Sequence, residues 1–163
     1  MRDAAATAPV IAIRHARPEE AQALTELSLR SKAVWGYEAS FLTRCRAAMT
    51  LMPEKLRAHP YYVATNSEGR PLGFYGFEPE KDGIGLDMFF VEPDAIRRGV
   101  GRALWDHAVA IARALGHREL VVVSDPNASG FYLKMGCRAA GAAPSELDPG
   151  RYLPVFRYGL EPR

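Results

Sequence analysis

Residues 84–104 constrain the fold of this chain more than any other stretch. They read as a hydrophobic strand, a short basic turn with two glycines, and the first turn of a helix. The first amides of a helix have no partner inside the helix, and the helix dipole adds partial positive charge at the same place. Gly99 and Gly101 lack the β-carbons that would keep a phosphate away from the backbone. The turn also carries three arginines, Arg97, Arg98 and Arg102. We therefore predict a diphosphate-binding turn.

Two common nucleotide-binding motifs do not fit this turn. A P-loop has a lysine and a hydroxyl residue directly after its last glycine, but neither follows Gly101. A Rossmann turn has a third small residue three places after the second glycine, but this chain has Leu104 there. A Rossmann turn also follows the first strand of a βαβ unit, and no such unit precedes this turn. Both classes are excluded.

Two stretches together match a known family. The strand ends in Val91-Glu92-Pro93, and the turn reads Ile-Arg-Arg-Gly-Val-Gly over residues 96–101. Residues 125–136 read Asp-Pro-Asn-Ala-Ser-Gly-Phe-Tyr-Leu-Lys-Met-Gly. These stretches resemble the Gln/Arg-x-x-Gly-x-Gly/Ala and Asn-x-x-Ala-x-x-x-Tyr-x-x-x-Gly motifs of the GNAT superfamily of acetyl-CoA-dependent N-acetyltransferases. Ile96 replaces the Gln/Arg and Asp125 the Asn. The resemblance covers roughly residues 61–140, and the rest of the chain more loosely.

The resemblance implies a cofactor, acetyl-CoA, held between two parallel strands that splay apart. The strands would be residues 86–91 and 120–124. The backbone of Phe90 and Val91 would bind the pantetheine arm, and an amide near Phe89 would donate to the thioester oxygen. Asn127 would substitute for the family asparagine. The implied cofactor-binding residues are Phe89, Phe90, Val91, Ile96, Arg97, Arg98, Gly99, Val100, Gly101, Arg102, Asp125, Asn127, Tyr132 and Lys134.

The resemblance also implies catalytic residues, because acetyl transfer needs an uncharged amine. Deprotonating a lysine-like amine at pH 7 costs roughly 4.6 kcal/mol, whereas an α-amine costs about 1 kcal/mol. A general base therefore matters most for a lysine-like acceptor. Asp87, on the strand beside the splay, is the candidate base, since family members often carry an acid there, and Glu38 is a second candidate. Tyr132 matches the family tyrosine that faces the sulfur and protonates the leaving thiolate.

In the family, the acceptor pocket involves the variable parts, which are the first two helices and the last strands. The resemblance implies the same location here. Trp35 and Tyr37 flank Gly36, where the chain can bend around a ligand. Glu38 follows directly, and Tyr152 after the Pro149-Gly turn would close the other side. The sequence does not identify the acceptor: it leaves open a small amine, an antibiotic, an amino acid or a protein amine.

The composition bounds the class of protein. The chain has 163 residues, 48% hydrophobic and 25% charged, with a net charge of +2. This is typical of a globular protein and argues against an electrostatic nucleic-acid partner. No apolar run approaches the roughly 20 residues that span a bilayer. We expect a flexible tail over residues 1–9, one acetyltransferase domain over residues 10–163, and a cytoplasmic protein without a membrane partner.

The cysteines and histidines indicate no metal site. Cys45 and Cys137 form no disulfide framework or metal motif. The four histidines lack metal-ligand spacing. We therefore expect no metal.

Hydrophobic periodicity and turn residues predict a mixed α/β fold. Strands are expected near residues 10–14, 61–65, 72–77, 84–91, 119–123, 138–141 and 155–160. Helices are expected at 18–32, 38–49, 53–58, 100–115 and 128–135. Val100, Leu104, Ala108, Ile111 and Leu115 would form the buried face of the long helix. The result is a mixed, mostly antiparallel sheet of six to seven strands with one splayed parallel pair and helices on both faces.

Three interpretations of function remain open. The first is an N-acetyltransferase in which a primary amine attacks acetyl-CoA directly in a ternary complex. The second is a non-catalytic sensor of CoA or acyl-CoA, and the third is a transferase that uses a longer acyl chain. A homodimer is possible for each. Release of free thiol from acetyl-CoA in the presence of amines separates the first from the second.

Overall fold

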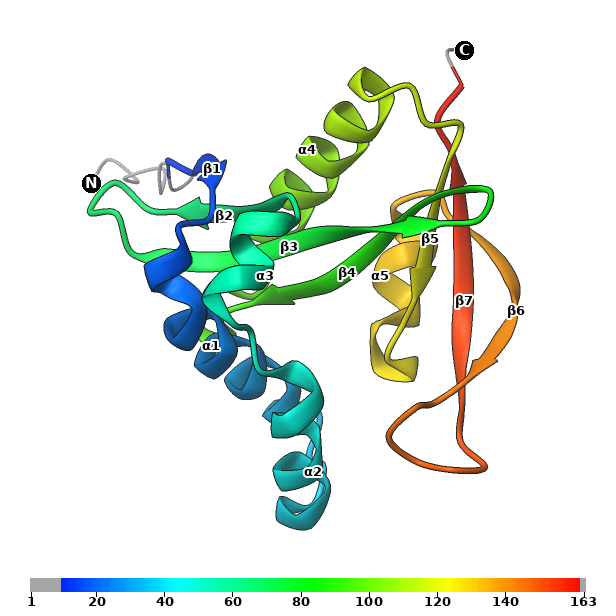
Figure 1. Cartoon of the computed structure of the whole chain (residues 1–163), viewed down its shortest axis with the longest axis horizontal. Helices are drawn as coiled ribbons and strands as arrows, with labels where there is room; N and C mark the ends of the chain where they lie inside the picture. Colours follow the sequence, from blue (N-terminus) through cyan, green and yellow to red (C-terminus); the bar gives the residue numbers. More distant parts are fainter. Residues whose placement is uncertain (1–9, 162–163) are drawn as a thin grey trace, which may run out of the picture.

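A computed structural model describes residues 10–161, and the expected tail over residues 1–9 lies outside this range. Within it the strands form a sheet in the order β1-β2-β3-β4-β5-β7-β6 (Figure 1). The strands are β1 (Ala12–His15), β2 (Tyr61–Thr65), β3 (Pro71–Glu80), β4 (Gly83–Val91), β5 (Glu119–Val123), β6 (Arg138–Pro144) and β7 (Tyr152–Gly159). The helices are α1 (Ala21–Ala33), α2 (Ala39–Met49), α3 (Pro53–Ala58), α4 (Val100–Ala114) and α5 (Ser129–Lys134), with 3₁₀ turns η1 (Pro18–Glu20), η2 (Pro93–Ala95) and η3 (Pro126–Ala128).

The sheet has the predicted mixed topology. Each pair of neighbouring strands is antiparallel except β4 and β5, which run parallel. The parallel pairing joins only residues 84–86 to residues 120–122, although β4 continues to Val91 beside β3. In Figure 1, β5 and β7 run steeply while β2 and β3 lie across the view. The predicted splay between β4 and β5 is thereby confirmed, and it begins after Leu86.

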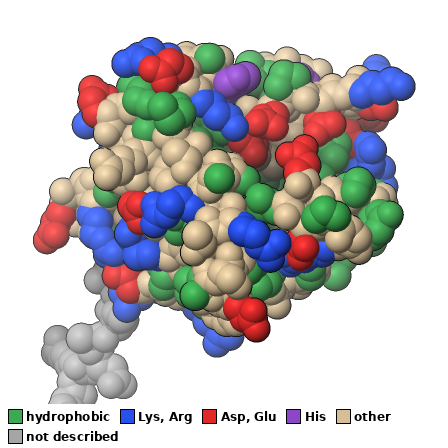
Figure 2. All heavy atoms as spheres, turned by 60° about the horizontal axis from the view of Figure 1, so that its bottom comes forward, with side chains coloured by type: hydrophobic (Ala, Val, Ile, Leu, Met, Phe, Trp, Pro, Cys, Tyr) green, Lys and Arg blue, Asp and Glu red, His purple; other side chains and the backbone are tan. Residues whose placement is uncertain are grey.

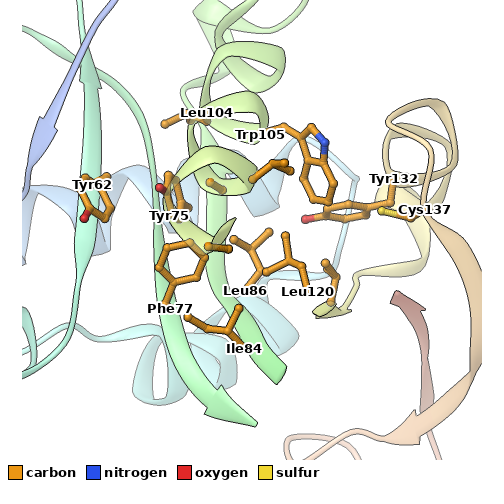
Figure 3. Close-up of a cluster of buried hydrophobic side chains, with 14 of the residues drawn as sticks. Tyr62, Tyr75, Phe77, Ile84, Leu86, Leu104, Trp105, Leu120, Tyr132 and Cys137 are labelled. Carbon is orange, nitrogen blue, oxygen red and sulfur yellow. The ribbon is translucent and has the colours of Figure 1, made fainter. Parts of the chain in front are cut away.

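Two hydrophobic clusters cover the two faces of the sheet. Alternate strand residues point to opposite faces, so Tyr62 and Tyr75 join one cluster while Tyr61 and Phe74 join the other. The larger cluster packs α4 and α5 against the sheet and includes the fully buried Leu104 (Figure 3). The smaller cluster packs α1 and α3 on the opposite face.

The long helix differs in one detail from the predicted buried face. Leu115 is 57% exposed, because α4 ends at Ala114 and the chain turns away there. Trp105 and Val109 are buried instead, and Trp105 packs edge-on against Tyr132 of α5. The buried face of the helix is therefore wider than predicted and ends before Leu115.

A third cluster links α2 to the end of β4. Phe41, Cys45 and Met49 of α2 are buried and pack with Met88 and Phe90 of β4.

Both cysteines, Cys45 and Cys137, are free thiols in buried positions. Among residues 10–161, no helix is both long and apolar enough to cross a membrane.

Candidate active site

A β-bulge in β4 marks the point where this strand leaves β5. Phe74 of β3 pairs with Phe90 and Gly76 pairs with Asp87, so two residues of β4 stand opposite one residue of β3. One of them, Met88, has a positive φ of 52°. Such a conformation is strained in a residue with a side chain and is common at functional sites. The bulge places Met88 and Phe90 on the α1/α2 side and Phe89 on the α4/α5 side.

Past the bulge, the backbone of β4 has one side free of strand partners. The amide of Glu92 donates to the Leu72 carbonyl on β3 at 2.8 Å. Backbone polar groups alternate in direction along a strand, so those of Phe90 also face β3 and those of Val91 face the splay. Of the two residues expected to bind a pantetheine arm through the backbone, Val91 therefore has the suitable orientation.

The turn over residues 96–102, called here the cofactor turn, has the backbone expected of an anion site. Arg97 and Gly99 both have positive φ, 64° and 85°, and α4 begins at the next residue, Val100. In the described part of the chain, the amides of residues 99–102 donate no backbone hydrogen bond, whereas Ala103 donates to the Gly99 carbonyl. A β-carbon at Gly101 would lie 3.2 Å from the Phe131 ring. The turn thus fits a diphosphate: it presents free amides, and a side chain at Gly101 would press against the Phe131 ring.

The arginines of this turn make few ion pairs with other described residues. Arg97, Arg98 and Arg102 are exposed. Arg102 lies 3.5 Å from Asp106, a surface pair one helical turn away, which contributes little. Their charges therefore remain available to an anion at the turn.

Asp87 is held by two side chains that the sequence analysis did not identify. The Tyr61 hydroxyl donates to the Asp87 carboxylate, and the Lys55 ammonium lies 3.2 Å from the same oxygen. Lys55 also pairs with Glu78 at 3.1 Å. Burial, followed by the hydrogen bond to Asp87, raises the pKa of Tyr61 far above its ordinary value, so this phenol stays protonated as a donor. A tyrosine pair in a buried strand was the available signal, since buried hydroxyls need a partner.

Tyr132 lies on the other face of β4, in α5. Its side chain is 5% exposed and contacts the rings of Phe89, Trp105, Phe131 and Phe156. Its hydroxyl makes no hydrogen bond within residues 10–161 and points away from α5 toward the middle of the cluster (Figure 3). No fully enclosed side-chain oxygen or nitrogen in this range lacks a partner, so this hydroxyl is not completely enclosed. Burial raises the pKa of Tyr132 well above its ordinary value, which keeps its proton in place at neutral pH.

Asp125 stands at the carboxyl end of β5 and joins segments distant in the sequence. Its carboxylate accepts hydrogen bonds from the Tyr37 hydroxyl at 2.7 Å and from Lys32 at 3.1 Å. The backbone amide and side-chain amide of Asn127 donate to its other oxygen at 2.9 and 3.0 Å. Arg151, before β7, donates to the Tyr37 hydroxyl at 2.9 Å. We call these residues, Lys32, Tyr37, Asp125, Asn127 and Arg151, the Asp125 cluster.

The Asp125 cluster connects the two halves of the molecule across the splay. Lys32 and Tyr37 belong to the α1–α2 region, which packs on β4, whereas Asp125 and Arg151 belong to the β5 and β7 side. Burial alone would raise the pKa of Asp125, but the hydrogen bonds from Tyr37 and Asn127 and the charge of Lys32 outweigh it and lower this pKa. The side chain expected to contact a cofactor is thus already committed to protein partners.

Replacing Asp125 with asparagine tests this arrangement through stability. A carboxylate whose pKa is lowered by folding stabilises the protein above its unfolded pKa and loses this contribution as pH falls through the folded value. We expect Asp125→Asn to lower the free energy of unfolding by about 1 kcal/mol at pH 7, since the charge-assisted part of the bonds is lost. Urea unfolding at several pH values should show the difference shrinking below pH 3.8, the ordinary pKa of this group. A difference that stays constant down to pH 2 would contradict the assignment.

Five further predicted site residues lie at the surface, and within residues 10–161 their side chains make no hydrogen bond. Trp35 is 46% exposed, Ile96 39% and Tyr152 64%. Glu38 precedes α2 without capping it, and Lys134 is the exposed last residue of α5. Of the acceptor residues expected from the sequence, Tyr37 alone is joined to the Asp125 cluster, and the roles of the others stay predictions.

Other parts of the described chain offer less to a cofactor. Residues 10–161 contain no group of three His, Cys, Asp or Glu side chains placed to hold a metal ion. An open hollow of about 590 Å³ lies at the far end of the sheet, between the β3–β4 turn and β7. Its charged residues include Arg118, Glu119 and Glu161, which pair with one another or with neighbouring arginines. The splay, with the groups described above, is the candidate site.

Comparison with known proteins agrees with this geometry. Residues 21–137 match the profile of the acetyltransferase (GNAT) family. The peptidyl-lysine N-acetyltransferase YjaB of Escherichia coli is 33% identical over 147 residues, which cover 85% of this chain and 88% of that protein. The fold is that of the PaiA N-acetyltransferase of Thermoplasma acidophilum, solved with coenzyme A, with a TM-score of 0.75 at 17% identity over 92% of this chain and 99% of that one. It is also that of a GNAT acetyltransferase of Brucella melitensis solved with acetyl-CoA, with a TM-score of 0.63 at 22% identity over 94% of this chain and 90% of that one. The chain therefore belongs to the GNAT acetyltransferase family.

Proposed function

We propose that this protein transfers the acetyl group of acetyl-CoA to a primary amine, the side chain of a lysine, by direct attack in a ternary complex. One observation carries the proposal: where β4 leaves β5, an acid lies on one face of the strand and a buried tyrosine contacts the other. An amine can then approach from the side of Asp87 while a thiol leaves on the side of Tyr132. The name of the YjaB relative, a peptidyl-lysine N-acetyltransferase, supports lysine as the acceptor.

The cofactor turn and Val91 would bind coenzyme A. The free amides of residues 99–102 and the three exposed arginines suit its phosphates. The backbone of Val91, which faces the splay, suits the amides of the pantetheine arm. Bound acetyl-CoA supplies an activated acetyl thioester.

Asp87 would act as the general base. The carboxylate removes a proton from the ammonium group of the acceptor, which costs roughly 4.6 kcal/mol at pH 7 for a lysine. Tyr61 and Lys55 fix the position of the carboxylate, since both contact the same oxygen and leave the other one open. The amine nitrogen then forms a bond to the acetyl carbon as the carbon–sulfur bond breaks, and the nitrogen releases its second proton to solvent as the amide forms.

Tyr132 would act as the general acid. Its hydroxyl keeps its proton at neutral pH and has no protein acceptor within the described residues. It is proposed to donate this proton to the departing sulfur, so that coenzyme A leaves as the thiol, and solvent then returns a proton to the phenolate.

Replacing Tyr132 with phenylalanine removes this proton donor and keeps the ring contacts. We expect kcat to fall by about 10- to 100-fold, at the low end of general-acid effects, because a thiolate leaves without much assistance. Free thiol released from acetyl-CoA measures the rate. An unchanged kcat in this variant would remove Tyr132 from the mechanism.

A thiol-release assay with acetyl-CoA and a panel of amines tests the proposed function. The panel contains lysine peptides, peptides with only an α-amine, polyamines and amino acids. We expect release with lysine peptides and binding of coenzyme A by calorimetry. Binding without release for any amine would instead indicate a CoA sensor, and faster turnover with longer acyl-CoAs would assign another acyl donor.

A further inference from the structure

We infer that Arg151 forms a carboxylate-binding subsite beside the acceptor amine, so that the enzyme prefers a lysine that lies close to a carboxylate. The inference rests on the proposed function and adds a specificity for the acceptor. The carboxylate can come from an acidic side chain next to the lysine in a peptide or from the α-carboxylate of free lysine.

The guanidinium of Arg151 is held in a fixed position. Its backbone amide donates to Asp148 at 2.9 Å and its carbonyl accepts from Ser145 at 2.8 Å, which closes the turn before β7. One of its terminal nitrogens donates to the Tyr37 hydroxyl. The guanidinium carbon lies 5.4 Å from the centre of the Tyr37 ring and 5.1 Å from that of Phe41, within the range of cation–π contacts. A positively charged group held this way needs little reorganisation to bind a ligand.

Arg151 differs from the other cations near it because it has no carboxylate partner. Lys32, which lies over the same two rings, is paired with Asp125 at 3.1 Å, and Arg44, over Phe41, lies 3.9 Å from Asp148. Within residues 10–161, no carboxylate oxygen lies within 4.0 Å of Arg151. Within this range the guanidinium makes one hydrogen bond, to Tyr37, which leaves most of its five N–H donors open. The planar array of these donors matches a carboxylate.

The subsite adjoins the face of β4 where the amine is proposed to react. Phe41, under Arg151, packs in one cluster with Met88 and Phe90, which follow Asp87 on β4. We expect the neighbouring groups of a lysine whose amine reaches Asp87 to lie farther out, in the direction of α2 and the β6–β7 turn. A carboxylate there can meet Arg151.

The surrounding surface carries charges of both signs. Figure 2, in which the bottom of Figure 1 comes forward, shows basic and acidic side chains interspersed over this face of the molecule. A general attraction of acidic peptides by a broad basic surface is therefore not expected. The preference should come from one well-placed guanidinium.

Acetylation kinetics of matched acceptors test the inference. The acceptors are one lysine peptide with glutamate beside the lysine, the same peptide with glutamine there, free lysine and lysine amide. For the native protein we expect about 10-fold higher kcat/KM for the glutamate peptide than for the glutamine peptide, the size of one charge-assisted contact at a partly exposed site. A similar ratio of free lysine over lysine amide would assign the α-carboxylate as a ligand as well; a ratio near 1 would restrict the ligand to peptides.

Variants of Arg151 and of its neighbour Arg44 provide the comparison. In Arg151→Gln the ratio of kcat/KM for the glutamate peptide to that for the glutamine peptide should fall to within about 2-fold. Arg151→Lys should keep part of the preference because it keeps the charge. Arg44→Gln, which removes a cation from the same Phe41 ring, should leave the preference intact.

Three outcomes would overturn the inference, and they are distinguishable. Equal rates for the two peptides with the native protein would exclude the subsite while leaving the proposed function in place. Equal loss with both peptides in folded Arg151→Gln, as judged by circular dichroism, would assign Arg151 a structural role. Absence of acetylation with any acceptor, despite bound acetyl-CoA, would overturn the proposed function and the inference together.

Discussion

Replacing Asp87 with asparagine should lower kcat/KM for a lysine acceptor by about 100- to 1,000-fold at pH 7, within the range of general-base effects. Asparagine keeps the shape of the side chain and can still accept the Tyr61 hydrogen bond, but it cannot take a proton. The loss should be smaller for an α-amine, whose deprotonation costs about 1 kcal/mol rather than roughly 4.6 kcal/mol. Thiol release with matched lysine and α-amine peptides measures both.

The pH profile and a control variant separate a base from a positioning residue. The rate of Asp87→Asn should recover as pH rises toward the pKa of the acceptor amine, because solvent then supplies the uncharged form. Glu78→Gln is the matched control, since Glu78 shares Lys55 with Asp87 and lies on the neighbouring strand. This control should keep its rate within about 2-fold. An equal loss for both kinds of amine and no recovery at high pH would show that Asp87 is not the base.

Elements with a strong local signal could be predicted from the sequence. The predicted bounds of α3, β2 and β5 coincide with those in the structure. The start of α4 at Val100 follows from the positive φ that Gly99 supplies. The helix expected from Ala128 begins instead as a 3₁₀ turn, because Pro126 and the Asp125 cap on Asn127 set up a tight turn first. Local chemistry was enough for these elements.

Contacts that depend on strand register could not be predicted. The pair of Tyr61 with Asp87 needs two strand pairings, β2 with β3 and β3 with β4, and the bulge at Met88 shifts the second. Lys32 and Asp125 are 93 residues apart and meet only because α1 crosses to the end of β5. No residue spacing in the sequence predicts the contact between Lys32 and Asp125. The family motif assigned Asp125 to the cofactor, while its protein partners became visible only in the structure.

The second large effect concerns the backbone of the cofactor turn. Gly99 and Gly116 flank the two ends of α4, and their φ angles, 85° and 83°, are almost equal. A β-carbon at either position would meet no atom within 4 Å, so valine acts there through backbone strain rather than through a clash. A β-branched residue strongly disfavours this conformation, and the cost should be about 1–2 kcal/mol of stability or more in both variants. The two positions thus form a matched pair.

We expect Gly99→Val to raise the Kd for coenzyme A by about 100-fold and Gly116→Val to leave it within about 2-fold. Strain at residue 99 turns the amides of residues 99–102 away from the phosphates, and losing one or two hydrogen bonds to a charged group costs about 1.5–3 kcal/mol each, so a 100-fold loss is within reach. Calorimetric titration gives the Kd, and urea unfolding checks that both variants are folded and similarly destabilised. If Gly116→Val weakened binding as much, the effect would follow stability, and the diphosphate site would have to be placed away from the start of α4. If neither variant weakened binding, the amides at this turn would not be the groups that hold the phosphates, because a distorted turn cannot keep these amides aimed at one anion.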